Sequence, residues 1–359
     1  MKKIALVSTI ALASITAAHA APTVYGKVLL TGEYTKDDYN VDKVNPTDPT
    51  KNEVDNSTTK LVSNSSRIGF KGDDDLTDTT KLVYQLEYGV DVDADTNGKG
   101  QFYSRNTFIG LAHNTMGTVL AGRHDTPYKL AKGSVDVFND YDNVGLGKLM
   151  YGENRADNVI AYKSPTLVGM PLTFMGAVAL SENDDKSPKV LDPKKGTTTT
   201  EANQKDNAYS AMVNYDQNGV YLAAGYDNNV GYANDAWRLV GSVDMGKMNM
   251  VQGLTLGALY QETDVYNKTE DEKSYLLSSK YKIAETPWAV KAQYINTSNF
   301  KGDVDVDAKE IALGAEYAFN KATKGHMYAA QIKTDKPANG NDLDKTIVGA
   351  GLEYKFYYI

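Results

Sequence analysis

Short segments in which apolar and polar side chains alternate recur along most of this chain. The clearest run lies between Leu61 and Asp125, where Lys81–Val90, Phe102–Leu111 and Thr118–Asp125 all show the pattern. Successive side chains of a β-strand point to opposite faces, so a period of two predicts strands. The Gly, Asp and Asn residues between the segments are typical of turns. This stretch therefore predicts antiparallel strands joined as hairpins.

The same pattern continues to the C-terminus and predicts an even number of strands. The sixteen expected strands are Val24–Thr35, Leu61–Gly72, Lys81–Val90, Phe102–Leu111, Thr118–Asp125, Asn158–Ser164, Leu172–Ser181, Ala208–Tyr215, Val220–Tyr226, Trp237–Asp244, Leu254–Thr263, Ser274–Ile283, Trp288–Thr297, Glu310–Phe319, His326–Thr334 and Thr346–Phe356. Asp73–Asp75 and Ala284–Pro287 are expected as tight turns, whereas Lys36–Lys60, Thr126–Arg155 and Glu182–Lys205 are long polar connections. A sheet with one short-turn end and one long-loop end would leave this alternation.

The N-terminus has the features of an export signal. Lys2 and Lys3 precede an apolar run, and Ala18-His19-Ala20 offers small residues to a signal peptidase. We expect residues 1–20 to be removed and residues 21–359 to form a single domain, because no linker or change in composition divides them. The chain has no cysteine, which excludes disulfides and thiolate metal sites.

Two classes of β protein fit this pattern. Near the C-terminus Val348, Leu352 and Tyr354 share one face, and Glu353 and Lys355 take the other. In a membrane barrel the apolar face meets lipid and the charged face meets water in the lumen, whereas in a soluble sandwich they are core and surface. The even strand number, the export signal and 25 tyrosines, which suit interfacial girdles, favour the barrel.

Composition narrows the function further. After the signal, no apolar run reaches the roughly 18 residues of a membrane helix. The net charge of −8 and the absence of a Lys/Arg cluster argue against nucleic acid as a partner.

Five motifs, in order, resemble the general-diffusion porins of the Gram-negative outer membrane, in the branch common among β- and γ-proteobacteria. They are Ser66–Leu76, Tyr84–Glu87, Ser104–Leu111, Gly122–Pro127 and Asn158–Pro165, and Val24–Lys27 is similar to the family's first strand. The resemblance implies an all-β, sixteen-stranded antiparallel transmembrane barrel with the third external loop folded inward. It also implies a homotrimer in outer-membrane lipid that passes small hydrophilic solutes and ions. Family members usually end on an aromatic residue, whereas Tyr357, Tyr358 and Ile359 follow Phe356 here.

The resemblance also suggests which residues line the narrowest part of the pore. A passive pore needs a constriction whose charges bias ion traffic. The motif positions give Lys27, Arg67, Arg105 and Lys163 as candidates for the wall. The acidic candidates on the third external loop are Asp136, Asp140, Asp142 and Glu153. Arg123, at the foot of that loop, is expected to form an anchoring ion pair.

Other motifs do not support catalysis, a metal site or a cofactor. Asp93–Gly98 matches the first half of a calcium loop, but Ser104 stands where the bidentate glutamate is needed. His124 and Asp125 are adjacent, yet no serine motif supplies a nucleophile. His113, His124 and His326 lack a second ligand at metal spacing.

The sequence therefore predicts a porin that works by passive diffusion. One alternative is a solute-specific channel of the same fold, which would show saturable block by its substrate. The other is a soluble or surface-attached β protein that acts by binding and produces no conductance steps.

Overall fold

The computed structural model describes residues 22–41, 53–94, 101–167, 169–181, 207–335 and 341–358. The expected export signal and the connection Glu182–Lys205 lie outside these residues. Among the helices of the described residues, none is long and apolar enough to cross a membrane.

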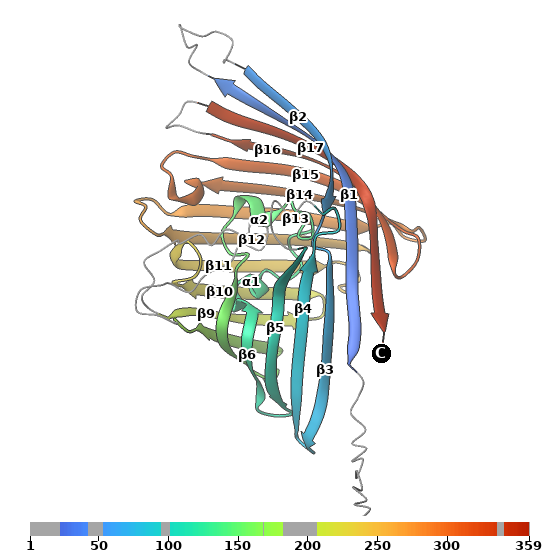
Figure 1. The fold of residues 1–359 in the computed structure, drawn as a ribbon, viewed down its shortest axis with the longest axis vertical. Helices are drawn as coiled ribbons and strands as arrows, with labels where there is room; N and C mark the ends of the chain where they lie inside the picture. The colour runs from blue at the N-terminus through green and yellow to red at the C-terminus, as the bar shows by residue number, and fades with distance from the viewer. Residues whose placement is uncertain are drawn as a thin grey trace, which may run out of the picture.

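The strands form one antiparallel sheet that closes on itself (Figure 1). The strands are β1 (Thr23–Val41), β2 (Glu53–Ser63), β3 (Arg67–Thr77), β4 (Thr80–Val90), β5 (Phe102–His113), β6 (Gly117–Asp125), β7 (Arg155–Lys163), β8 (Leu172–Ala179), β9 (Ala208–Gln217), β10 (Val220–Asn228), β11 (Ala233–Asp244), β12 (Leu254–Val265), β13 (Glu272–Lys282), β14 (Trp288–Ser298), β15 (Ala308–Ala318), β16 (Thr323–Thr334) and β17 (Asn341–Tyr358). β1 pairs with β17 from Val24–Tyr358 to Val41–Asn341, and this pairing closes the barrel. Because β2 and β3 are parts of one interrupted strand, the expected barrel of sixteen strands is confirmed.

The interruption between β2 and β3 lies at Asn64–Ser66, within the strand expected at Leu61–Gly72. Ser65 has a left-handed backbone, with φ of 48°, which a strand cannot continue through. Side chains replace the lost ladder: Leu29 N donates to Ser66 Oγ at 3.0 Å, and Ser66 Oγ donates back to Leu29 O at 3.2 Å. The expectation of one continuous strand is therefore wrong, and both parts still pair with β1.

Two expected connections are also corrected. The polar stretch Lys36–Lys60 is not all loop, because β1 runs on to Val41 and β2 begins at Glu53. Asp73–Asp75 is not a turn but part of β3, where Lys81 on β4 lies 2.7 Å from Asp73 and 3.3 Å from Asp75. The cross-strand lysine offsets the repulsion that would otherwise disfavour consecutive acidic residues in a strand.

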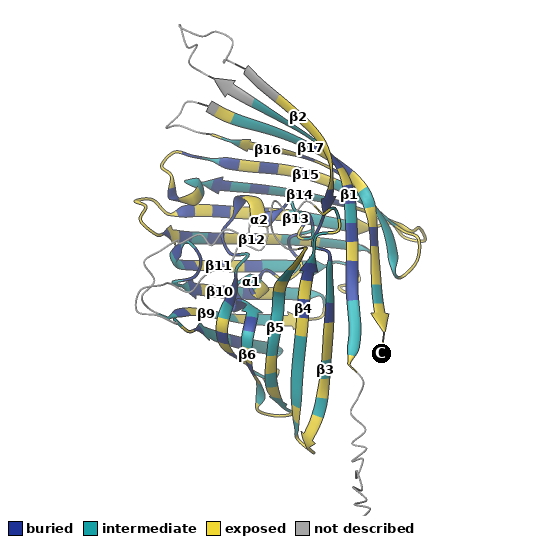
Figure 2. Ribbon diagram, in the orientation of Figure 1, coloured by how far each residue is buried: buried dark blue, intermediate teal, exposed yellow. Residues whose placement is uncertain are grey.

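Along most strands, successive residues alternate between a more buried and a more exposed face (Figure 2). On β14, Lys291, Gln293 and Ile295 are buried in the interior, whereas Val290 is exposed on the outside. The outer face is largely apolar, as a surface in contact with acyl chains requires. The inner face is not uniformly polar, since Leu276, Ile295 and Ile347 also point inward and are fully buried.

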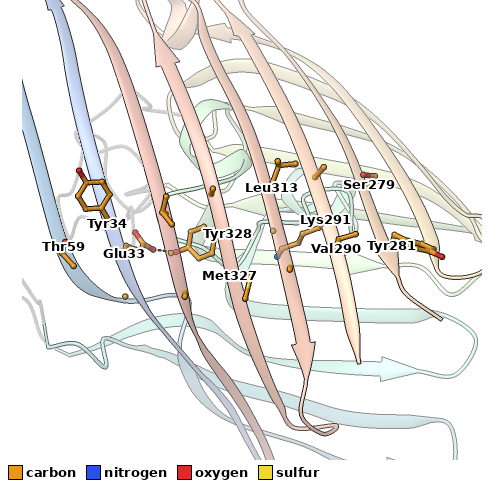
Figure 3. Close-up of a pocket in the computed structure, with 18 residues that line it drawn as sticks. Glu33, Tyr34, Thr59, Ser279, Tyr281, Val290, Lys291, Leu313, Met327 and Tyr328 are labelled. Carbon is orange, nitrogen blue, oxygen red and sulfur yellow. Dashed lines mark hydrogen bonds between the residues drawn. The ribbon is translucent and has the colours of Figure 1, made fainter. Parts of the chain in front are cut away.

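A shallow hollow of about 1020 Å³ follows β13 to β17 and β1 (Figure 3). Most of its lining side chains, including Val290, Leu313 and Met327, belong to the exposed outer face. Lys291 and Tyr328 are on the same strands but face inward.

The long connection between β6 and β7 lies inside the barrel (Figure 1). We call residues 126–154 the inner loop. It contains two short helices, α1 (Pro127–Ala131), capped by Thr126, and α2 (Leu146–Leu149). A further single turn of 3₁₀ helix, η2 (Phe300–Gly302), lies between β14 and β15. The inner loop lies at the same end of the barrel as the connections β8–β9, β10–β11, β12–β13, β14–β15 and β16–β17, and we call this end the long-loop end. The opposite end, with the turns between β3 and β4, β5 and β6, β9 and β10, β13 and β14, and β15 and β16, is the short-turn end.

Candidate pore constriction

Apolar packing holds the inner loop against one side of the barrel interior. The loop contributes eight buried apolar side chains to this cluster: Ala131, Val135, Phe138, Tyr141, Val144, Leu146, Leu149 and Met150. They pack against inward-facing residues of β10 to β17, among them Leu259, Leu276, Ile295 and Ile347. These wall residues would otherwise be exposed to water in the lumen. Burial of both apolar surfaces therefore stabilises the loop inside the barrel.

Wall side chains also satisfy the backbone of the inner loop. Loop N–H groups donate to the wall from Tyr128 (to Ser210, 3.0 Å), Val137 (to Gln293, 3.0 Å), Gly145 (to Glu310, 3.0 and 3.1 Å) and Tyr151 (to Glu272, 2.9 Å). Loop carbonyls accept from the wall at Ala131 (from Tyr221, 2.9 Å), Val137 (from Lys291, 2.9 Å) and Leu149 (from Thr297, 2.6 Å). Because an irregular buried segment cannot pair its backbone internally, these side chains provide the partners that it lacks.

Arg238 on β11 is the most buried cation of this system. Its guanidinium donates to Tyr151 O at 2.9 Å, to Tyr128 O at 3.3 Å and to Gln261 Oε1 at 2.8 Å. Its guanidinium carbon lies 3.9 Å from the centre of the Tyr128 ring. Arg238 thus joins the first and last turns of the inner loop to the same point on the wall.

Ion pairs link the two ends of the inner loop. Asp125 lies 2.9 Å from Lys129 and 2.8 Å from Arg155, so it bridges the beginning of the loop and the start of β7. Glu153 lies 2.6 Å from Lys132 and 3.7 Å from Lys129. Burial alone would raise the pKa of Glu153, but Lys132 and Lys129 hold it below its usual value.

The loop residue that reaches the charged wall is Asp140. Its carboxylate lies 2.8 Å from Lys27 Nζ on β1 and 3.9 Å from Arg67 on β3. Burial would raise the pKa of Asp140, but the Lys27 ammonium and the Arg67 guanidinium lower it to about 2. Asp140 is 37% exposed and Arg67 is 28% exposed, whereas Lys27 is only 2% exposed. Asp140 and Arg67 therefore border the open lumen, and Lys27 supports Asp140 from behind.

Glu87 on β4 lies within the row of wall cations and was not among the residues expected there. Its carboxylate lies 2.6 Å from Arg105 Nε and 3.7 Å from Arg67 Nε, and it accepts from Tyr25 Oη at 3.0 Å. The sequence already indicated the position of Glu87. It shares the face of Val83 and Gln85 and is the last residue of the motif Tyr84–Glu87. The alternation along β4 thus placed this carboxylate inside the lumen.

Two other acidic candidates of the inner loop, Asp142 and Asp136, make their contacts elsewhere in the barrel interior. Asp142 adjoins the strand break, where its N–H donates to Asn64 Oδ1 at 2.8 Å. Asp136 is buried within the loop and accepts from Phe138 N, Leu146 N and Gln293 Nε2 at 3.1 to 3.2 Å. Burial raises the pKa of Asp136.

Three further candidates lie apart from the contact of Asp140 with the wall. Glu153 belongs to the base of the loop, as described above. Arg123 forms an ion pair with Asp157 on the neighbouring strand β7 rather than with the loop. Lys163 is exposed at the short-turn end of β7, and within the described part of the chain its side chain has no hydrogen-bond or ion-pair partner.

A closed barrel with an apolar outer face and a charged lumen narrowed by its own loop is a membrane channel. The chain belongs to the Gram-negative porin family, whose profile matches residues 5–337. It is an outer-membrane porin through which small hydrophilic solutes and ions diffuse passively.

Similar proteins support this assignment. The major outer membrane protein P.IB of Neisseria meningitidis serogroup A is 26% identical over 318 residues, which cover 83% of this chain and 85% of that protein. The major outer membrane protein P.IA of Neisseria meningitidis serogroup B is 28% identical over 306 residues, covering 83% and 74%. These relatives are channels rather than enzymes.

Solved structures share the fold. The anion-selective porin from Comamonas acidovorans aligns with a TM-score of 0.70 at 20% identity, over 94% of this chain and 99% of that chain. OmpF of Salmonella typhi, in complex with daunomycin, aligns with a TM-score of 0.62 at 16% identity, over 92% and 98%. A trimer form of OmpT of Vibrio cholerae aligns with a TM-score of 0.54 at 15% identity, over 92% and 99%.

Proposed function

We propose that Asp140, Arg67, Arg105 and Glu87 border the constriction of this porin and that solutes are selected there by size and by charge. The observation that carries the proposal is the contact of Asp140 with Lys27 and Arg67, which joins the inner loop to the charged wall. Opposed charges across a water-filled gap produce a transverse field, which favours dipolar solutes over apolar ones.

The constriction itself is close to charge balance. Each wall cation has a carboxylate nearby: Lys27 has Asp140, Arg105 has Glu87, and Arg67 has both. Glu353 on β17 also lies 4.0 Å from Lys27 and 3.1 Å from Lys355, so three carboxylates serve four cations, which leaves a small positive excess. Selection at this point is therefore weakly in favour of anions and mainly a matter of size.

The exported chain, without residues 1–20, is expected to act as a homotrimer in outer-membrane lipid. Support for three copies comes from the structural relative described as a trimer form. The bond network of the inner loop supports a fixed constriction, because many wall residues would have to release the loop together before it could move.

Planar bilayers distinguish this function from the solute-specific alternative. The purified protein should give discrete conductance steps that rise with salt concentration, and liposomes containing it should swell at rates set by solute size. A single solute that blocks conductance saturably at low concentration, with no effect of other solutes of the same size and charge, would instead show a solute-specific channel.

A further inference from the structure

A second group of cations faces the lumen near the short-turn end of the barrel, and it adjoins the proposed constriction because Lys291 lies 3.3 Å from the hydroxyl of Tyr141, next to Asp140. Lys280 on β13, Lys291 on β14 and Lys324 on β16 surround a single carboxylate, Glu316 on β15. We call these four residues the lysine cluster. Figure 3 shows Lys291 on β14, the member that lies closest to the inner loop.

The distances show that the three ammonium groups share one carboxylate. Lys280 Nζ lies 2.8 Å from both oxygens of Glu316, Lys291 Nζ lies 3.3 Å from Oε1, and Lys324 Nζ lies 3.4 Å from Oε2. One carboxylate neutralises one cation, so the cluster retains an excess of two positive charges. Ammonium groups this close repel one another. Of the three lysines, Lys291 is the one that holds the inner loop in place. That role does not explain why Lys280 and Lys324 lie beside it.

Lys291 is occupied by the inner loop. It is buried, donates to Val137 O at 2.9 Å and lies 4.5 Å from the ring centres of Phe138 and Tyr141. Lys280 and Lys324, by contrast, are 28% and 34% exposed, so their ammonium groups are open to water. The excess charge is therefore presented to the lumen by these two residues.

Lys280 and Lys324 are spaced so that one anion can contact both. Both contact Glu316 Oε2, at 2.8 and 3.4 Å, so their nitrogen atoms cannot be farther apart than the sum of these distances. Two oxygens of one carboxylate or phosphate can accept charge-assisted hydrogen bonds of about 2.8 Å from two such ammonium groups.

One ring nitrogen of a buried histidine beside the cluster lacks a partner among the described residues. His326 on β16 is paired in register with Glu316 and is more than nine-tenths buried. Its Nδ1 lies 2.8 Å from Tyr141 Oη, whereas its Nε2 has no hydrogen-bond partner among the described residues. A buried polar atom without a partner is uncommon in a folded protein, so this nitrogen remains able to form a further hydrogen bond.

We propose that the lysine cluster is an oxyanion-binding site, which takes up carboxylates or phosphates between the constriction and the short-turn mouth of the pore. Lys280 and Lys324 contact the anion, and Glu316 holds the two ammonium groups together while keeping binding weak enough for release. The proposal rests on the proposed channel function and adds to it, since the nearly balanced constriction then leaves anion preference to this site.

The test uses the full-length protein in planar bilayers, with K280Q/K324Q as the variant. Its preference for chloride over potassium in a salt gradient should fall about threefold or more, because two of the surplus charges are gone. Inorganic phosphate and acetate, added separately, should each reduce the chloride conductance of the parent protein, and the concentration for half-reduction should rise several-fold in the variant. The two anions show whether the site distinguishes phosphates from carboxylates.

Two further variants test whether the effect is specific to the lysine cluster. E316Q removes the only carboxylate of the cluster and should shift selectivity in the opposite direction, toward anions. K333Q removes a lysine from the long-loop end of the same strand, β16, and should change neither selectivity nor phosphate block. Heat-modifiable electrophoretic mobility checks that each variant is folded.

An open channel with unchanged selectivity and unchanged phosphate block in K280Q/K324Q would overturn the oxyanion site while leaving the porin function intact. The absence of phosphate and acetate block in the parent protein would also overturn it. Absence of conductance steps in the parent protein would instead contradict the channel function itself.

Discussion

The carboxylate of Asp140, on the inner loop, lies 2.8 Å from the ammonium of Lys27 on β1. This pair connects a loop that packs against β10 to β17 with the strand that closes the barrel. Lys27 is almost completely buried, so its charge acts on solutes mainly through Asp140, which it holds in place. The proposed constriction is therefore organised around a buried cation and the partly exposed carboxylate beside it.

Replacing Asp140 with asparagine should increase the preference of the pore for anions. Lys27 and Arg67 lose the carboxylate that they share, so the positive excess at the constriction grows. Reversal potentials in a salt gradient measure the change, and Asp216→Asn, at the exposed end of β9 beside the turn to β10, is a matched control. Equal selectivity of the parent and D140N would show that Asp140 does not border the ion path.

The effect of Asp140 on ion selectivity should persist at acidic pH. Its pKa is lowered to about 2, so the carboxylate stays ionised at pH values well above that, and its contribution is lost only as the pH falls through about 2. The difference in reversal potential between the parent and D140N should therefore be constant from neutral pH to about pH 4. A difference that already vanishes near pH 4 would mean that the ion pair with Lys27 does not form.

Arg67→Glu should move ion selectivity toward cations. At about 4 Å from a passing ion, one charge is worth about 1 kcal/mol in bulk water and about 4 kcal/mol at an effective dielectric constant of about 20. Permeability ratios should change several-fold at low salt, and the change should shrink as salt shortens the Debye length. Arg67→Lys keeps the charge and serves as the control. Unaltered selectivity of R67E at low salt would remove Arg67 from the constriction.

Deleting residues 136–147 should raise the unitary conductance and admit larger solutes, because the deletion removes Asp140 and the middle of the inner loop. It should also lower the temperature of unfolding, since Leu276 and Ile295 lose apolar neighbours and become exposed to water. Liposome swelling and heat-modifiable mobility measure the two effects. A conductance equal to that of the parent protein would place the loop outside the ion path.

Arg238→Met should loosen the inner loop without opening the barrel. The carbonyl of Tyr128 loses its donor, at a cost of about 1–3 kcal/mol for a buried group left unsatisfied, whereas the carbonyl of Tyr151 keeps only the hydrogen bond from Gln261 Nε2. We expect noisier single-channel currents and a lower unfolding temperature. Leu239→Ala, on the outer face of the same strand, should leave the current noise unchanged. Quiet currents in R238M would show that the other contacts are sufficient to hold the loop.

The direction of the barrel in the membrane can be tested with single cysteines, because the chain has none of its own. A maleimide on a polymer too large for the lumen should label Glu270→Cys, between β12 and β13, on intact cells. It should label Thr286→Cys, between β13 and β14, only after the cells are opened. The reverse pattern would invert the topology.

The alternation of side chains was sufficient to predict the strands, and together with the export signal and the tyrosines it favoured a membrane barrel over a soluble sandwich. It placed nearly all the strands, the even count and the charged lumen face, because each strand residue points in or out according to its position alone. The motifs Ser66–Leu76 and Ser104–Leu111 correctly indicated the family and brought Arg67 and Arg105 to attention. The same alternation would have placed Glu87 inside the lumen as well.

Only the tertiary structure decided which inward-facing residues become neighbours. Lys280, Glu316 and Lys324 lie on three different strands, and whether they meet depends on the register of each strand pair, which short segments of sequence do not encode. The path of the inner loop is likewise set by packing against Leu276 and Ile295, whose inward direction runs against the rule that apolar residues face lipid. This packing determines which charged residues of the wall the loop contacts. Because of it, Asp140 reaches Lys27 and Arg67, whereas Asp136 remains buried within the loop.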